Sequence, residues 1–326
     1  MFKAHKEDRH PETCNMNFVC TWHREAQFNE NQNIQIKELL FKRDNHQDDN
    51  AVTIIPIPYR LKTLRFQSSD SKYKIGAETF SNNKLERIDV SNNILSHLIG
   101  PLRNTKNLKY LNLSSNVCSN ISTFFFSPDF NILEELLLGN NLLGLVLPSD
   151  THGHIFQNLL NLRKLDLSEN RISLLPNLIF KSQRKLEILD LSSNFLEKID
   201  FQLSQLTNLS YLNLRNNLIT LIDSHTIVEI NVIADMSKNL SINLLENRLV
   251  CPCNSENFIK WICSTSVHIV NTNHNFLSII NRKTCPHEKH PRNLQKFRKR
   301  LYILRSSYFW TSCNNSFIFH CSYPGY

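Results

Sequence analysis

The chain has 326 residues, of which 41% are hydrophobic, so it is long and apolar enough to bury a sizeable core. Glycine is scarce, at 6 residues, and no G-x-G-x-x-G or Walker-type sequence occurs, which excludes nucleotide binding through a glycine-rich phosphate loop. The formal net charge is +8, with a basic run between Lys296 and Arg300, and we interpret this balance as a solvated basic surface.

The first segment, residues 1–35, begins with a polar and charged stretch and contains no apolar run of the kind found in a signal peptide. It includes Cys14 and Cys20. We expect this segment to be either a partial cap for the structure that follows or a disordered stretch. No run in the chain approaches the roughly 18–20 apolar residues of a membrane-spanning helix.

A repeated pattern follows over residues 36–249. Its clearest copy, residues 162–180, reads L-x-x-L-x-L-x-x-N-x-I-x-x-L-P-x-x-x-F. A weaker copy begins at Ile36, and a degraded last copy includes Asn247. The first leucine of the pattern recurs at intervals of 24, 23, 25, 29, 24 and 23 residues, at Leu61, Leu85, Leu108, Leu133, Leu162, Leu186 and Leu209. Repeats of roughly 20–29 residues with leucines in these positions are leucine-rich repeats.

The spacing of the leucines predicts the fold of each repeat. In LRKLDL, the residues Leu162, Leu165 and Leu167 are predicted to point inward and the residues between them outward, as in a short strand. Strands of successive coils pair side by side and line one face. The predicted fold class is therefore an α/β repeat, a leucine-rich-repeat solenoid curved like a horseshoe, with parallel strands on its concave face.

Two further positions of the repeat carry structural side chains. A buried asparagine after each strand can both donate and accept hydrogen bonds, so stacked copies are predicted to form a ladder. This position is occupied by Asn93, Asn116, Asn141, Asn170, Asn194, Asn217 and Asn247. The far side of the coil is predicted to bury Phe80, Leu102, Phe126, Phe156, Phe180, Leu203 and Ile227. Phe156 comes five residues late, so we expect the extra residues near 149–154 to form a loop that leaves the coil.

The chain has 9 cysteines, most of them near its two ends. The segment LVCPCNSENFIKWIC resembles the C-terminal cap of extracellular leucine-rich repeats, with Phe258 and Trp261 as its aromatic residues. We therefore predict a cysteine-rich cap over residues 250–313 and a tail over residues 314–326. Because the number of cysteines is odd, at least one thiol is free or pairs with another chain. Cys118 occupies a core position of the repeat and is expected to be a buried free thiol.

The repeats, the degraded copy SINLLENRL and the C-P-C and F-I-K-W sequences together resemble the C-terminal part of the ectodomain of a Toll-like receptor. In that family the first and third, and the second and fourth, cysteines of the cap pair. The resemblance thus implies disulfides between Cys251 and Cys285 and between Cys253 and Cys313, with Cys263 as an alternative partner. Cys14 and Cys20 resemble the loop of an N-terminal cap.

The resemblance also implies a function, that of a pattern-recognition receptor of innate immunity. Such a receptor binds a protein or microbial ligand on its solenoid, dimerises, and signals through a membrane span and a cytoplasmic domain that are missing from this sequence. A secreted stand-alone leucine-rich-repeat protein for binding or adhesion is the main alternative, and an intracellular scaffold is a third.

Disulfide capping requires an oxidising compartment, so we expect the chain to lie on the extracellular side of a membrane or to be secreted. Since no signal peptide is visible, we expect the sequence to be a fragment or truncated form. Five asparagines stand in glycosylation sequons and are candidate glycan sites: Asn112, Asn120, Asn208, Asn239 and Asn314.

The outward positions of the predicted strands are the candidate binding surface. Basic and acidic residues are mixed there, with Glu134 and Glu135 flanked by basic neighbours, which does not resemble the uniform basic stripe of a nucleic-acid site. Tyrosine and arginine are common anchors of interfaces. The candidate binding residues are Tyr110, Arg163, Lys164, Asp166, Tyr211, Asn213 and Arg215. The inserted residues 149–154 are an alternative site.

We expect no catalytic residue, no metal and no cofactor. Three clusters carry metal-ligand residue types, but each is better explained as part of a cap or of a solvated loop. These clusters are Cys14, Cys20 and His23; Asp150, His152 and His154; and Cys285, His287 and His290. The serines that precede the asparagine ladder recur with the repeat, which indicates a structural role: Ser91, Ser114, Ser168 and Ser192.

Overall fold

The computed structural model describes a continuous central part of the chain and several shorter pieces. The described residues are 18–21, 38–42, 62–66, 74–75, 84–102, 105–237, 239–249, 257–258, 261–262 and 265–270. Of these, residues 18–21, 38–42, 65–66 and 74–75 are described by their backbone alone. The predicted cap cysteines from Cys251 onward, as well as Cys14, lie outside the described residues, whereas Cys20 lies in the first strand. The predicted limits of the segments and the cysteine-rich cap therefore stay predictions.

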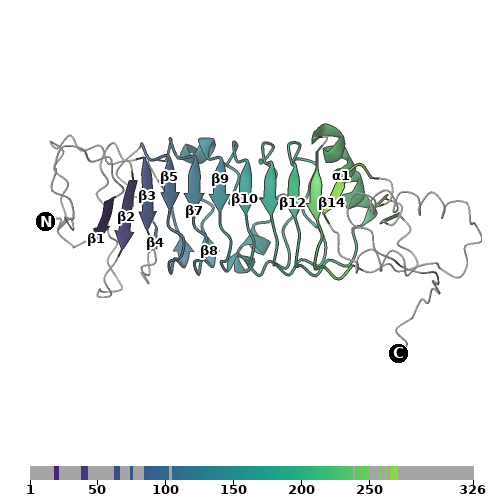
Figure 1. The fold of residues 1–326 in the computed structure, drawn as a ribbon, viewed down its shortest axis with the longest axis horizontal. Helices are drawn as coiled ribbons and strands as arrows, with labels where there is room; N and C mark the ends of the chain where they lie inside the picture. Colours follow the sequence, from purple (N-terminus) through teal and green to yellow (C-terminus); the bar gives the residue numbers. More distant parts are fainter. Residues whose placement is uncertain are drawn as a thin grey trace, which may run out of the picture.

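The strands form one long parallel sheet of 11 members, with one strand from each coil (Figure 1). The strands are β1 (Phe18–Thr21), β2 (Glu38–Lys42), β3 (Thr63–Phe66), β5 (Arg87–Asp89), β7 (Tyr110–Asn112), β9 (Glu135–Leu137), β10 (Lys164–Asp166), β11 (Ile188–Asp190), β12 (Tyr211–Asn213), β13 (Ser241–Asn243) and β14 (His268–Val270). The middle residue of each strand pairs with the middle residue of its neighbours, as Leu136 does with Leu165. The prediction of a parallel leucine-rich-repeat solenoid is confirmed.

Shorter elements complete the coils away from this sheet. A second parallel sheet contains β4 (Lys74–Ile75), β6 (His97–Leu98) and β8 (Asn120–Ile121). Three 3-10 helices follow, η1 (Pro128–Ile132), η2 (Leu143–Leu145) and η3 (Leu147–Ser149). The α-helix α1 (Ser224–Ser237) replaces the irregular segment of one coil near the C-terminal end of the sheet (Figure 1).

The core of the solenoid is built from the positions that the repeat predicts. The leucine positions are buried, and a spine of phenylalanine rings packs from coil to coil, in stacked, tilted and edge-to-face pairs. The ring centroids of Phe126 and Phe156 lie 6.2 Å apart, those of Phe156 and Phe180 6.3 Å, and those of Phe180 and Phe201 5.3 Å. Leu102, Leu203 and Ile227 are buried as predicted, while Phe80 lies outside the described residues. At these centroid distances the rings of neighbouring coils are in contact with one another.

The asparagine ladder joins each coil to the one before it. Asn170 is completely buried, and its Nδ2 donates to the carbonyls of Leu138 in the preceding coil (2.9 Å) and Ser168 in its own coil (2.8 Å). Its Oδ1 accepts from the backbone N–H of Leu143 at 3.2 Å. Asn194 repeats the arrangement one coil later. The amide oxygen of Asn170 therefore satisfies a backbone N–H that would otherwise be buried without a partner.

A tight turn precedes the ladder residue in every described coil. The residue just before the asparagine has a positive φ of 53–59°, although it is never glycine: Asn92, Ser115, Asn140, Glu169, Ser193, Asn216 and Glu246. This conformation is unfavourable for side chains other than Asn and Asp, so the surrounding hydrogen bonds must enforce it. The serines predicted to be structural do so, since Ser168 donates through both its N–H and its hydroxyl to Oδ1 of Asp166.

The insertion at residues 149–154 is a compact turn that packs on the next coil, so the prediction of a loop leaving the coil is wrong. Asp150 is buried, and its carboxylate accepts from the backbone N–H groups of His154 (2.8 Å) and Ile155 (2.9 Å). Gly153 has a φ of +63°, and a Cβ there would lie 2.0 Å from the carbonyl oxygen of Leu178. The carboxylate supplies partners inside the turn, which the residue count could not reveal.

The C-terminal end of the described core is closed by α1 and an aromatic pair. Asp223 caps α1 by accepting from the N–H of Thr226 at 2.9 Å. Phe258 and Trp261 are buried with ring centroids 6.2 Å apart, and the Trp261 indole N–H donates to Asn231 on α1. These contacts cover the last coil, whose apolar core would otherwise face water.

The ladder predicts a clear effect of Asn170→Ala. The substitution leaves the buried Leu143 N–H without a partner, while the carbonyls of Leu138 and Ser168 each lose one of two donors, so we expect a loss of about 1–3 kcal/mol of unfolding free energy. Urea denaturation followed by circular dichroism measures it. The matched control is Asn177→Ala at an exposed position, expected to change stability by less than about 0.5 kcal/mol. Equal denaturation midpoints for the two variants would show that the ladder amide contributes little.

Candidate ligand-binding surface

The outward side chains of the parallel sheet form three rows that run across the coils. We call this surface the strand face, and it comprises the residue before each strand (the entry row), the first strand residue (the first row) and the third strand residue (the third row). The middle strand residues are buried beneath it. Because the strands are in register, neighbours within a row lie one strand spacing apart, about 4.8 Å.

The entry row alternates in charge from coil to coil. It contains Lys62, Glu86, Lys109, Glu134, Arg163 and Glu187 in consecutive coils. Ion pairs join Lys62 to Glu86 (2.7 Å), Lys109 to Glu134 (3.8 Å) and Arg163 to Glu187 (2.7 Å). The hydrogen bonds and charge of Glu187 raise the pKa of the Arg163 guanidinium further above its ordinary value. The charges of this row therefore largely cancel in pairs.

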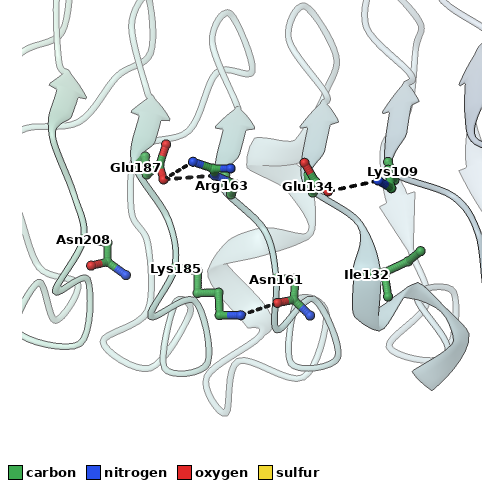
Figure 2. A pocket seen from close by; sticks show the side chains of 8 residues that line it. All are labelled: Lys109, Ile132, Glu134, Asn161, Arg163, Lys185, Glu187 and Asn208. Carbon is green, nitrogen blue, oxygen red and sulfur yellow. Dashed lines mark hydrogen bonds and ion pairs between the residues drawn. The ribbon is translucent and has the colours of Figure 1, made fainter.

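A groove lies along the entry row, at and before the N-terminal ends of the strands (Figure 2). Its volume is about 550 Å³, and it is lined by Lys109, Ile132, Glu134, Asn161, Arg163, Lys185, Glu187 and Asn208. Lys185 donates to the side-chain oxygen of Asn161, and the Arg163–Glu187 pair spans the neighbouring coils (Figure 2). The groove is open, and its lining residues are polar or charged except for Ile132, which suits contact with another macromolecule better than enclosure of a small ligand.

The first row mixes aromatic, apolar and charged side chains. The guanidinium of Arg87 lies 3.8 Å from the centre of the Tyr110 ring, a cation–π contact between β5 and β7. Burial, followed by the nearby Asp89 carboxylate, raises the pKa of the Tyr110 hydroxyl above its ordinary value, so this group stays a neutral hydrogen-bonding group. Further along lie Glu135, Lys164, Ile188 and Tyr211, all half-buried.

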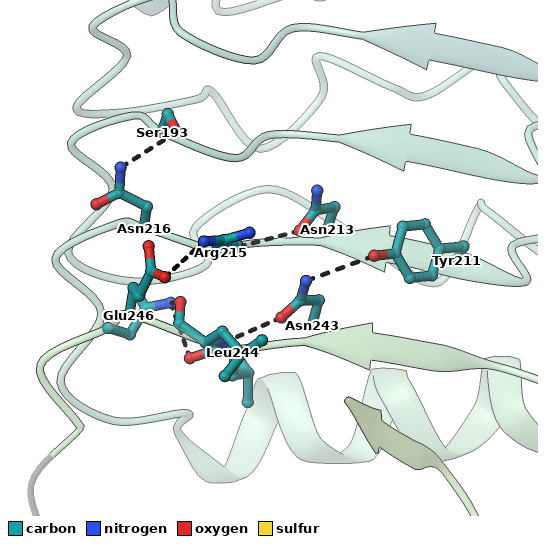
Figure 3. A network of polar contacts seen from close by, with 10 residues as sticks. Ser193, Tyr211, Asn213, Arg215, Asn216, Asn243, Leu244 and Glu246 are labelled. Atoms are coloured by element: carbon teal, nitrogen blue, oxygen red, sulfur yellow. Dashed lines mark hydrogen bonds and ion pairs between the residues drawn. The ribbon is translucent and has the colours of Figure 1, made fainter. Parts of the chain in front are cut away.

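The third row consists mainly of Asp and Asn side chains that also hold the following turns. Near the C-terminal end they join a polar network (Figure 3). Asn213 donates to Asp190 at 3.0 Å, and Asn243 donates to the Tyr211 hydroxyl at 3.5 Å. Arg215, which follows this row, donates to Glu246 of the next coil at 2.6 Å (Figure 3). These side chains are held in place before any partner binds.

All seven candidate binding residues are exposed or half-buried on this one side of the sheet, but the structure divides them into three groups. Tyr110 lies on β7, the triad Arg163, Lys164 and Asp166 lies at β10, and the remaining three lie at β12 and just after it. The sequence reasoning missed three partner residues: Glu187, Asp190 and Glu246. Glu187 could have been identified from the sequence, because the charges of the entry row alternate in sign from coil to coil.

The candidate glycan sites differ in accessibility. Asn120, Asn208 and Asn239 are exposed, and Asn208 borders the groove. Asn112 is 9% exposed, and its Oδ1 accepts from both the N–H and the hydroxyl of Ser114. Asn314 lies outside the described residues.

The candidate metal-ligand residues can be checked within the described part of the chain. Among them, no group of three or more His, Cys, Asp or Glu side chains is placed to hold a metal ion. The rings of His152 and His154 stack at 5.4 Å, while Asp150 beside them accepts backbone hydrogen bonds. Burial raises the pKa of the Cys118 thiol to about 12, so it is not an activated nucleophile. In the part of the chain that is described, no helix is long and apolar enough to cross a membrane.

Comparison with known proteins agrees with this architecture. Residues 160–219 match the family model described as leucine rich repeat. The chain is 22% identical to the crystal structure of human 5T4 (trophoblast glycoprotein), which superposes with a TM-score of 0.54 over 67% of this chain and 82% of that one. The chain therefore has the leucine-rich-repeat fold, and proteins of this fold are typically binding modules rather than enzymes.

Within this class, the chain resembles Toll-like receptors. It is 37% identical over 208 residues to Toll-like receptor 4 of Pinctada imbricata, an alignment that covers 64% of this chain and 23% of the relative. It is 29% identical over 191 residues to human Toll-like receptor 5, covering 58% of this chain and 20% of that receptor. The chain thus spans less than a quarter of the length of either relative.

The environment of Cys118 predicts its reactivity. At a pH near 8.5 an ordinary cysteine is about half ionised, but Cys118 stays protonated and shielded because burial raises its pKa to about 12. Iodoacetamide labelling followed by peptide mass spectrometry should find Cys118 unmodified in the folded chain and modified in guanidinium. Rapid labelling of Cys118 without denaturant would mean that this part of the core opens readily.

Proposed function

We propose that this chain is the ligand-binding part of a Toll-like innate immune receptor, and that its strand face contacts a protein or microbial ligand. The observation that supports this best is the similarity to a Toll-like receptor over 64% of the chain, combined with a strand face whose outward side chains are not needed for the core. Signalling would then pass through a membrane span and a cytoplasmic domain outside this sequence.

Three features of the strand face support protein binding. Tyr110 and Tyr211 are half-buried rings that present a large contact area at little entropic cost. Arg163, Lys164 and Asp166 add charges of both signs, and Asn213 and Arg215 extend the same surface to the next coils. Interfaces gain specificity from such complementary charges and affinity from aromatic anchors.

Receptor function also requires two chains to come together. We propose that ligand binding favours a dimer, because a single solenoid has no means to bring two signalling domains into contact. The proposed location is the extracellular side of a membrane, and Asn120, Asn208 and Asn239 are exposed and available for glycans there.

The alternative is a secreted leucine-rich-repeat protein for binding or adhesion. The likeness to human 5T4 extends over most of that chain, so the fold alone is compatible with a protein other than a Toll-like receptor. The two proposals share the strand face as binding surface. They differ in whether ligand binding has to be coupled to a membrane span.

A chimeric receptor separates the two proposals. The whole chain is fused to a single membrane span and a Toll-type signalling domain in reporter cells, which are then exposed to fractionated microbial material. We expect a dose-dependent reporter response, because the strand face recognises its ligand and the ligand pairs the chains. A soluble chain that coats cells while the chimera gives no response would favour the adhesion protein.

Substitutions in the chimera then test the surface. Tyr110→Ala and Tyr211→Ala remove aromatic anchors and should each raise the half-maximal ligand concentration about tenfold. The matched control is Phe124→Ala, which removes an aromatic ring that is 74% exposed and lies away from the strand face. If the control weakens the response as strongly as the two tyrosine substitutions do, ligand binding does not occur on the strand face.

The extracellular location predicts the oxidation state of the cap. Peptide mapping under non-reducing conditions, on protein isolated from its native compartment, should recover Cys251 linked to Cys285 and Cys253 linked to Cys313, or Cys263 in place of one partner. Oxidising compartments maintain such bonds. Recovery of Cys251, Cys253 and Cys285 as free thiols would contradict the extracellular location and favour an intracellular scaffold.

A further inference from the structure

The third row of the strand face is interrupted at one coil. From β5 to β13 every third-row residue is Asp or Asn except Leu137 on β9. Leu137 is half-buried and pairs in register with Asn112 on one side and Asp166 on the other. In the other coils from β5 to β13, the Asp or Asn at this position accepts a hydrogen bond from the turn that follows the strand. Leu137 cannot accept such a bond, so its side chain has no role in the turn.

The neighbouring Asp166 has a carboxylate oxygen that the turn does not use. Its Oδ1 accepts from the N–H and hydroxyl of Ser168 at 2.9 and 2.7 Å. Its Oδ2 lies over Gly139, where a Cβ would approach it to 3.0 Å, and accepts no hydrogen bond from the described residues. By contrast, Oδ2 of Asp190 accepts from Asn213. Asp166 therefore presents a carboxylate oxygen beside the apolar side chain of Leu137.

The surroundings of Leu137 carry an excess of negative charge. On β9, β10 and β11 the first and third rows hold three carboxylates, one ammonium group and two apolar side chains. These six residues, which we call the acidic strand patch, are Glu135, Leu137, Lys164, Asp166, Ile188 and Asp190. Their formal charges sum to −2, against +8 for the whole chain. Within the described residues, neither Glu135 nor Lys164 takes part in an ion pair, whereas the adjacent entry row is paired.

We infer that the acidic strand patch binds a lysine- or arginine-rich segment of a protein ligand. The aliphatic part of such a side chain can lie on Leu137 and Ile188, while its charged end reaches Asp166 or Glu135. A nucleic acid or another polyanion meets like charge here and is disfavoured, although the chain as a whole is basic. This inference rests on the proposed function, since it names the chemistry of the ligand on the same face.

The chain itself supplies substitutions that preserve the fold. Asn occupies the third row in three other described coils, where its Oδ1 accepts the same turn hydrogen bonds, as in Asn112 with Ser114. Asp166→Asn and Asp190→Asn therefore remove charge without removing the turn, and Asp190→Asn also removes the hydrogen bond from Asn213. Together with Glu135→Gln they form a triple variant that neutralises the patch. A second variant, Leu137→Asn, replaces the apolar side chain by an amide and leaves the formal charge of the patch unchanged.

The test measures binding of a synthetic oligolysine peptide to the whole chain by isothermal titration calorimetry at low salt. We expect oligolysine to bind the unmodified chain and to bind the triple variant at least about tenfold more weakly. Added salt should weaken binding to the unmodified chain, because the contacts are exposed. An oligoglutamate peptide of equal length and a single-stranded RNA serve as anionic probes and should not bind at the patch. Leu137→Asn should weaken oligolysine binding by a smaller factor.

A control variant with the same change in charge separates local from general electrostatics. It combines Asp129→Asn, Glu197→Gln and Asp235→Asn, three carboxylates away from the strand face, and should leave oligolysine binding within about twofold. Equal losses in the two triple variants would overturn the inference, as would failure of oligolysine to bind or RNA binding that depends on the patch.

The same variants distinguish failure of this inference from failure of the proposed function. If the ligand of the chimeric receptor binds the triple variant unchanged while Tyr211→Ala weakens it, the acidic strand patch is not the site and the strand face remains the binding surface. If neither change affects that ligand, both proposals are wrong. Loss of ligand binding in the triple variant, with the control variant unaffected, supports both.

Discussion

The structure depends on a buried amide that bonds two coils at once. From Asn116 to Asn247, the ladder asparagine of each coil donates to carbonyls of its own coil and of the preceding coil, and accepts from a backbone N–H of the preceding coil, as Asn170 does with Leu138 and Leu143. Irregular backbone inside a protein is costly unless its polar groups are paired. The ladder supplies those partners, and it also fixes the distance and the register between coils.

The register has a direct consequence for the binding surface. When every strand pairs with its neighbour without a shift, outward residues of the same rank line up as rows, and residues 21–30 positions apart in the chain become neighbours. The inward leucines, the asparagines and the phenylalanine spine hold the solenoid together. The outward rows are thus available to be acidic, basic, aromatic or apolar, which is why proteins of this fold present broad surfaces for other macromolecules.

Much of the fold could be predicted, because the position of a residue within the repeat determines whether its side chain is buried or exposed. Leu165, Phe156 and Asn170 lie buried in the roles that the pattern assigns to them. The insertion was harder, because a residue count shows that a segment is longer but not that Asp150 and Gly153 fold it onto the next coil. The cap cysteines lie outside the described residues. Within the described residues, the C-terminal end is covered by α1 and the buried pair Phe258 and Trp261.

The sequence by itself determined which residues face inward and which face outward, because a repeat of constant period places each residue type at one depth. Only the tertiary structure decided which outward charges neutralise each other and which remain available. Glu187 pairs with Arg163, whereas Asp166 keeps an open oxygen beside Leu137. Such pairings depend on contacts between side chains of different coils, and those follow from packing distances and rotamers rather than from the order of residues along one coil.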